Sequence, residues 1–308
     1  MDPSSKLNIV YSLFTPNVAT IAGAFTNAYI TLVILFDYFQ TKIMSASNKV
    51  LVALSLSNVY VSLILSVNSI ISFFWPQMYA EPYVKGYILA LLIFGIASCA
   101  WTTTCLCVFY FVKIINFSSR LLTSFKMRIN ILVPWLILFS EVVSLGCSFL
   151  TLLPYANSLE PSSNTTLFYS VNSTSGVSGI YTGFMKVTFV AVCVPLLIIF
   201  VTTFSTIGSL YLHSRRMEST GTTNSVTPHR SAVCMIAWLL LLYTVIFVVL
   251  FSYFLHPISP PSFGYWMSYN LIYVFTLVQS VVLIQGNPKL KEAFARYFNG
   301  FCSMKKAT

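Results

Sequence analysis

Apolar and polar positions follow a long-range pattern along this chain, in which extended apolar runs are separated by short polar or charged connections. A helix rises 1.5 Å per residue, so about 20 apolar residues cross a hydrocarbon core of about 30 Å. The pattern predicts seven transmembrane helices, over residues 13–36, 50–74, 86–112, 129–153, 184–211, 231–255 and 264–286.

The connections leave no room for a second domain. Only residues 154–183 form a long polar segment, rich in Ser, Thr, Asn and Gly, and we expect a loop there. Residues 287–308 follow the last apolar run as a tail. The chain is therefore predicted to be one all-α membrane domain over residues 1–308, a bundle of seven transmembrane helices.

Composition agrees with a membrane protein and weakens other interpretations. Charged residues make up 8% of the chain, hydrophobic residues make up 57%, and the mean hydropathy is +0.81. A soluble domain of this composition would lack polar side chains to cover its surface. The net charge of +10 would otherwise suggest a nucleic-acid partner, so the positions of the charges matter.

Basic residues are distributed unevenly between the two sides of the predicted membrane. Of the 17 Lys and Arg, all but Lys6, Lys85 and Lys186 fall in alternate connections and in the tail. Cytoplasmic loops carry such an excess of Lys and Arg. The asymmetry predicts an extracellular N-terminus, a cytoplasmic C-terminus and an extracellular loop at 154–183. It also accounts for the charge without a nucleic-acid partner.

Three Asn-X-Ser/Thr sequons test this orientation. Asn164 and Asn172 lie in the predicted outer loop, and we expect a glycan on at least one of them. Asn116 lies on the predicted cytoplasmic side, where no glycan is added.

Catalytic and metal-binding patterns are lacking in the sequence. The seven cysteines show no CxxC pair and no metal-ligand spacing with histidine, and there are no paired acids or nucleophile motifs. We expect no enzyme activity, cofactor or metal. Glu141 is the one ionisable residue near the middle of a span, and such a residue faces the bundle or is neutral. A structural hydrogen bond is the favoured interpretation, with a ligand contact as the alternative.

The third span ends in a long motif, from Trp101 through Thr104-Cys105-Leu106, Phe109-Tyr110 and Lys113-Ile114 to Asn116-Phe117-Ser118. This block resembles the W-x-x-T-C-L-x-x-F-Y-x-x-K-I-x-N-F-S pattern of the bitter taste receptors, the taste receptor type 2 family of G-protein-coupled receptors. Further matches occur at the end of the fifth span, with Ser209, Leu210 and His213, and at the end of the seventh.

The resemblance implies a plasma-membrane receptor that binds small bitter-type agonists and activates a gustducin-like heterotrimeric G protein. It assigns coupling to Lys113, Asn116 and His213, although Lys113 also suits contact with lipid phosphates of the surrounding membrane. The ligands are expected to be largely apolar or amphipathic. A vomeronasal-type or other chemosensory receptor and, from another class, a small transporter remain alternatives.

Some residues depart from the family pattern and suggest a divergent member, with a non-mammalian receptor as one interpretation. Asn58 stands where the family commonly has Arg, and Gln279 stands where it commonly has His before Ser280. We expect Asn58, Gln279, Ser280 and Glu141 to form internal polar contacts that bear on activation.

The predicted ligand pocket comes from two helices. Leu92 and Ile96 lie two turns and one turn to the outer side of Trp101, where mammalian members often have polar or aromatic residues. Tyr265 and Tyr269 are four residues apart and share a helical face, whereas Trp266 is about 100° round the helix. We therefore expect Leu92, Ile96, Tyr265 and Tyr269 to line the pocket.

Overall fold

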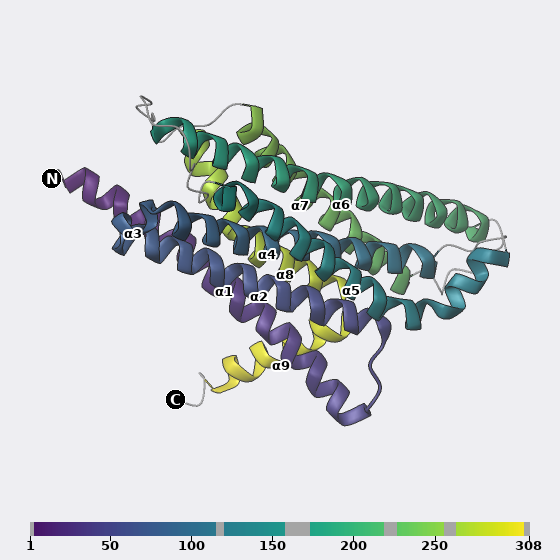
Figure 1. The fold of residues 1–308 in the computed structure, drawn as a ribbon. Coiled ribbons are helices and arrows are strands. Elements are labelled where there is room, and N and C mark those ends of the chain that lie inside the picture. Colours follow the sequence, from purple (N-terminus) through teal and green to yellow (C-terminus); the bar gives the residue numbers. More distant parts are fainter. Residues whose placement is uncertain (1–2, 115–119, 158–172, 219–226, 256–262, 305–308) are drawn as a thin grey trace.

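A computed structural model describes residues 3–114, 120–157, 173–218, 227–255 and 263–304. Every regular element in these segments is a helix (Figure 1). The helices are α1 (Pro3–Thr41), α2 (Ala46–Phe74), α3 (Pro76–Ala80), α4 (Pro82–Ile114), α5 (Arg120–Asn157), α6 (Ser173–Glu218), α7 (Thr227–Leu255), α8 (Phe263–Gly286) and α9 (Pro288–Met304).

The prediction of a seven-helix membrane bundle is confirmed. Within the described segments, six helices are each long and apolar enough to cross a membrane. The seventh crossing involves α8, which is followed by α9 after a bend of 103°. Because α8 has 24 residues and is therefore about 36 Å long, it can span the hydrocarbon core by itself.

The helices extend beyond the apolar runs that predicted them. In particular, α5 continues to Asn157 and α6 starts at Ser173, so both helices enter the segment 154–183 that was expected to be a loop. Hydropathy marks the part of a helix that lies in lipid, whereas backbone hydrogen bonds can continue into water. The limits of the helices therefore could not be taken from the apolar runs.

Local signals explain where the helices stop. After α1, Lys42 has a positive φ of 56° and donates its backbone N–H to Tyr38 O at 2.7 Å. Ser45 then caps α2 by accepting a hydrogen bond from Asn48 N at 3.3 Å. Pro288, which cannot donate a backbone hydrogen bond, starts α9 after the bend. The sequence reading missed α9 because it is amphipathic rather than continuously apolar.

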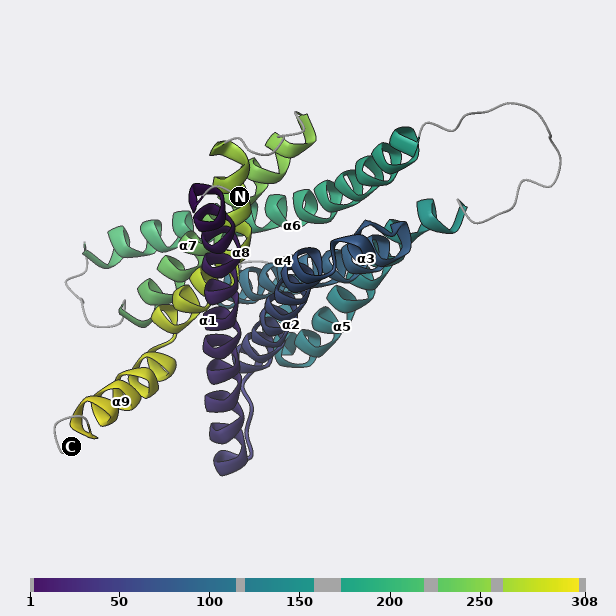
Figure 2. The same ribbon diagram turned by 90° about the vertical axis from the view of Figure 1, so that its left-hand side faces the viewer.

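The central helix of the bundle is α4. In its most apolar segment 72% of the residues are buried, compared with 17% in α5. It packs against α2, α5, α6 and α7, while α1 packs on α2 and α8 (Figure 2). At the contact of α1 with α8, a Cβ at Gly23 would lie 2.7 Å from Thr276 Oγ1, so this close approach requires glycine.

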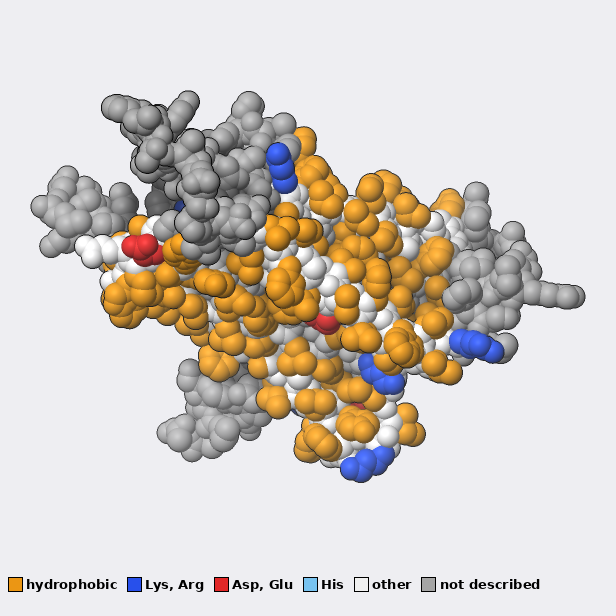
Figure 3. Space-filling view, in the orientation of Figure 1, with side chains coloured by type: hydrophobic (Ala, Val, Ile, Leu, Met, Phe, Trp, Pro, Cys, Tyr) orange, Lys and Arg blue, Asp and Glu red, His pale blue; other side chains and the backbone are white. Residues whose placement is uncertain are grey.

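Apolar side chains cover the outside of the bundle, and its interior holds polar side chains among the apolar ones. Hydrophobic groups dominate the described face in Figure 3. Ile131 and Trp135 on α5 are 69% and 67% exposed, whereas Asn27, Asn58 and Gln279 are fully buried. This distribution is stable when the surroundings are lipid, because exposed apolar surface then has no contact with water.

Candidate functional site

A small cavity lies within the bundle between α2, α4, α6, α7 and α8. Its volume is about 50 Å³, and it is lined by Val61, Leu65, Ile96, Cys99, Val192, Tyr243, Ile246, Ile272 and Phe275. Pockets for drug-sized ligands occupy about 300–1,000 Å³. The cavity is therefore closed in this structure, and side chains or helices must move apart before a ligand of that size fits.

The structure places the two predicted pocket residues of α4 at or beside this cavity. Ile96 contributes to the wall. Leu92, one turn away, is 7% exposed and belongs to a buried cluster that includes Val61, Leu65 and Tyr273. Val61 and Leu65, together with Cys99, belong both to this cluster and to the cavity wall, so they connect the two. A ligand contact by Leu92 or Ile96 remains a prediction.

The side chains of Tyr265 and Tyr269 lie outside the described residues, although their backbone belongs to α8. The same helix contributes Ile272 and Phe275 to the cavity wall. Tyr265 precedes Ile272 by seven residues, nearly two turns, so the two positions are about 20° apart round the helix. Tyr269 is about 60° from Ile272, and Trp266 is about 120° away.

Tyr243 connects the cavity to a buried polar network. Its ring forms part of the cavity wall and meets Phe275 edge-on at 5.3 Å between centroids. Its hydroxyl is 2.9 Å from Thr103 Oγ1, which also accepts a hydrogen bond from Gln279 Nε2 at 2.9 Å. Gln279 Nε2 lies 3.4 Å from the Tyr243 hydroxyl as well. These contacts join α4, α7 and α8.

Gln279, which was predicted to make internal polar contacts, uses one of its two polar side-chain atoms in this network. The residue is fully buried, and its Oε1 has no hydrogen-bond partner among the described residues. An unpaired buried acceptor costs about 1–3 kcal/mol. Another arrangement of the helices that offered Oε1 a donor would recover this free energy.

A second network surrounds Asn58 and joins α1, α2, α4 and α8. Asn58 Nδ2 donates to Asn27 Oδ1 at 3.1 Å, and Cys99 Sγ donates to Asn58 Oδ1 at 3.1 Å. Asn27 Nδ2 in turn bonds Gly23 O at 2.8 Å and Thr276 O at 3.2 Å. A neutral amide at position 58 suits these partners because it both donates and accepts.

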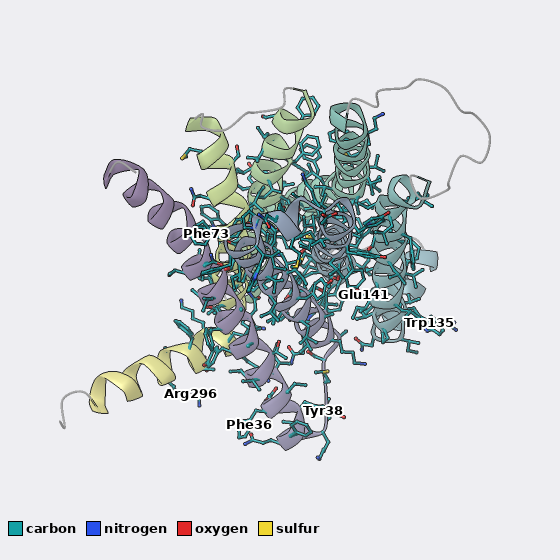
Figure 4. The ribbon with its side chains drawn as sticks, turned by 60° about the vertical axis from the view of Figure 1, so that its left-hand side comes forward. Phe36, Tyr38, Phe73, Trp135, Glu141 and Arg296 are labelled. Carbon is teal, nitrogen blue, oxygen red and sulfur yellow. The ribbon has the colours of Figure 1, made fainter. Side chains whose placement is uncertain are left out.

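Glu141 belongs to a third network, away from the cavity. Figure 4 shows it on the side of α5 that faces the bundle, while Trp135 points outward. Its Oε1 lies 2.7 Å from Ser98 Oγ, which is 2.7 Å from Ser57 Oγ, and Ser57 Oγ donates to Ala53 O at 3.0 Å.

Ser98 Oγ donates to Glu141 Oε1 and Ser57 Oγ donates to Ala53 O, so the two serine hydroxyls link Glu141 on α5 to α4 and α2. The contacts agree with a structural hydrogen bond, and Glu141 is not part of the cavity wall.

Of the predicted coupling residues, Lys113 has a described side chain, and it lies at the end of the bundle where α4 stops. Lys113 is exposed in the last turn of α4, and its Nζ lies over the Phe109 ring at 5.7 Å from the centroid. Nearby, the Tyr110 hydroxyl is 3.1 Å from Ser47 Oγ on α2. Asn116 and the side chain of His213 lie outside the described residues.

Tyr243 and Thr103 were not identified from the sequence. Tyr243 lines the cavity, and its hydrogen bond to Thr103 connects the cavity wall to the polar network. A tyrosine in the middle of an apolar run was an available signal, because a buried phenol needs a hydrogen-bond partner. Conversely, Ser280 was expected to make an internal contact, and among the described residues its hydroxyl donates to Leu277 O on its own helix, at 2.7 Å. This bond does not join helices.

The long apolar helices and the apolar exterior define the class of the protein, which is a multi-pass α-helical membrane protein. The family model for the taste receptor protein (TAS2R) matches residues 4–301. The chain belongs to this family of chemosensory G-protein-coupled receptors. Among the classes left open by the sequence, this match selects the taste receptors.

Individual relatives are similar over nearly the whole chain. Human taste receptor type 2 member 39 is 28% identical over 284 residues, which are 89% of this chain and 82% of the relative. Taste receptor type 2 member 9 of Macaca mulatta is 26% identical over 314 aligned positions, covering 98% of each chain. Member 10 of Pan troglodytes is 28% identical over 289 residues, which are 90% of this chain and 89% of that relative.

Proposed function

We propose that the chain is a plasma-membrane receptor for small, largely apolar or amphipathic bitter-type compounds, which bind at the cavity and activate a heterotrimeric G protein of the gustducin type. The observation that carries this proposal is the double role of Tyr243, whose ring lines the cavity while its hydroxyl contacts Thr103. A ligand that displaces the ring must also disturb the polar network.

The cavity wall supports the ligand class. Its lining is aliphatic and aromatic apart from the Cys99 thiol and the Tyr243 phenol, so affinity would come mainly from apolar burial at about 25 cal/mol per Å². The face of α8 that holds Ile272 also carries Tyr269 and Tyr265, about one and two turns further out. Their phenols would orient an amphipathic ligand.

Activation follows from unequal binding to two arrangements of the bundle. The closed cavity and its intact contacts represent the resting arrangement, and an agonist binds better to a widened one. A difference of about 1–3 kcal/mol between the two shifts the population about 5- to 150-fold. The unpaired Gln279 Oε1 favours this change, because leaving the resting arrangement frees Gln279 to find a donor.

In the proposed orientation, the G protein binds at the end of the bundle where Lys113 lies. The N-terminus would be extracellular and the C-terminus cytoplasmic, as the distribution of Lys and Arg indicates. Lys113, Asn116 and His213 would then lie on the side of the membrane where a G protein binds.

The test is a calcium-release screen of cells that express the chain with a promiscuous G protein, using a panel of bitter compounds. We expect responses to apolar or amphipathic members. Ile96→Phe should fill the cavity and weaken the response about tenfold or more. Leu91→Phe is the control, because Leu91 is 44% exposed on the same helix. A silent but surface-expressed receptor would contradict the ligand class, and equal responses of both variants would place the ligand elsewhere.

A further inference from the structure

A second and larger cavity lies outside the bundle, in the angle between α1 and α9. Its volume is about 730 Å³, and the ends of the two helices supply nearly all of its walls. In Figure 4 the labelled Phe36 and Arg296 lie on the two sides of this angle. We call it the α1/α9 cleft, and it is far larger than the closed cavity between the helices.

One wall of the α1/α9 cleft is apolar and faces the membrane. Tyr29, Leu32, Val33 and Phe36 follow one another along α1 at helical spacing. Leu32 and Phe36 are 65% and 66% exposed. At this depth their surroundings are lipid, so hydrocarbon chains are the apolar material available to cover them.

The other wall carries charges of both signs. Lys289 Nζ and Asp37 Oδ2 form an ion pair at 3.5 Å, which bridges α9 and α1. Glu292 and Arg296 also line the cleft, four residues apart on one face of α9. That spacing favours an ion pair, yet none joins these two side chains or links either of them to another described residue.

Two basic and two acidic groups around one cleft complement a ligand that carries both charges. The phosphate of a phospholipid is an acceptor for Arg296 and Lys289. An ammonium group with N–H donors satisfies Glu292 and Asp37, because a carboxylate only accepts hydrogen bonds. A choline group has no N–H donor, and phosphatidylglycerol has no ammonium group.

We propose that the α1/α9 cleft binds one molecule of phosphatidylethanolamine from the leaflet on the α9 side of the membrane. Arg296 and Lys289 contact its phosphate, Glu292 and Asp37 contact its ammonium group, and its acyl chains cover Leu32 and Phe36. The bound lipid joins α9 to α1 and fixes the direction of α9. This site is independent of agonist binding and of the G protein.

The proposal can be tested by native mass spectrometry of the purified full-length chain. The protein is titrated with phosphatidylethanolamine, phosphatidylcholine and phosphatidylglycerol that share the same acyl chains. We expect one tightly bound phosphatidylethanolamine, with an affinity about three- to tenfold above that for either other lipid. Equal binding of all three lipids, or strongest binding of phosphatidylglycerol, would overturn the proposal.

Variants place the binding at the cleft. Glu292→Gln should reduce phosphatidylethanolamine binding to the level of phosphatidylcholine. Arg296→Gln should weaken binding of all three lipids because each carries a phosphate, and Leu32→Trp should do the same by occupying the cleft. The controls are Lys42→Gln and Glu81→Gln, which remove one basic and one acidic residue outside the cleft lining and should change nothing. Thermal midpoints within about 2 °C of wild type show that the variants fold. Selectivity that survives Glu292→Gln, lipid binding that is unchanged in Arg296→Gln, or a loss in the controls would rule out this site.

Discussion

The hydroxyl of Tyr243 on α7 lies 2.9 Å from Thr103 Oγ1 on α4, while the ring of the same tyrosine forms part of the cavity wall. One side chain therefore lines the cavity and bonds a second helix. Under the proposed function, an agonist that moved this ring would alter the contact between α4 and α7 without any intermediate residue.

Tyr243→Phe should raise basal signalling. The substitution keeps the ring but removes a hydrogen bond worth about 0.5–1.5 kcal/mol, which favours the active arrangement roughly two- to tenfold if the contact belongs to the resting one. Basal calcium release at matched surface expression measures the effect. The control is Tyr60→Phe, which removes a phenol that bonds Leu91 O between α2 and α4 outside the cavity lining. Unchanged or lower basal activity would contradict the view that the contact between Tyr243 and Thr103 stabilises the resting arrangement.

Glu141→Gln should be nearly neutral for stability and signalling, because the amide oxygen can accept the Ser98 hydroxyl hydrogen as Glu141 Oε1 does. Glu141→Leu removes that partner, and we expect the free energy of unfolding to fall by about 1 kcal/mol. Thermal unfolding of the purified receptor compares the two variants. A loss with Gln as large as with Leu would show that a charged carboxylate is needed.

Lys113→Ala should weaken agonist-evoked G-protein activation more than it weakens surface expression, since the residue is exposed at the proposed cytoplasmic end of α4. Surface labelling alongside calcium release separates the two quantities. Lys85→Ala, near the start of α4, is the matched control for loss of one charge. If expression and signalling fell together, the role of Lys113 would instead be to anchor α4 to lipid phosphates.

The proposed pocket face of α8 predicts a graded response at Tyr269. For an agonist that uses the hydroxyl, Tyr269→Phe should cost about 0.5–1.5 kcal/mol, and Tyr269→Ala should cost more because the ring is lost too. Trp266→Ala should leave potency nearly unchanged. Dose–response curves at matched expression decide the question. A sensitive Trp266 beside a silent Tyr269 would mean that the opposite face of α8 meets the ligand, and Tyr265 would then be excluded as well.

The proposed orientation predicts glycans at Asn164 or Asn172 and none at Asn116. Replacing both of the first two with Gln should abolish the mobility shift that endoglycosidase produces. Asn116→Gln is the internal control and should leave the shift intact. A shift that disappeared only with Asn116→Gln would reverse the topology.

The sequence alone determined the membrane architecture. Seven apolar runs of sufficient length can satisfy their backbone groups in lipid only as helices, so the number and approximate places of the spans follow from hydropathy. The block from Trp101 to Ser118 indicated the family. The cost of a buried charge also required that Glu141 face the bundle or be neutral, before any partner was known.

Only the tertiary structure decided which polar groups meet. Thr103, Tyr243 and Gln279 lie on three helices far apart in sequence, and nothing in the local pattern of any helix reveals the rotation that brings them together. Hydropathy measures the free energy of placing a helix in lipid, whereas helix contacts depend on side-chain shape and hydrogen bonding between neighbours. For the same reason the ion pair between Asp37 and Lys289, and the cleft around it, appear only once α9 turns back towards α1.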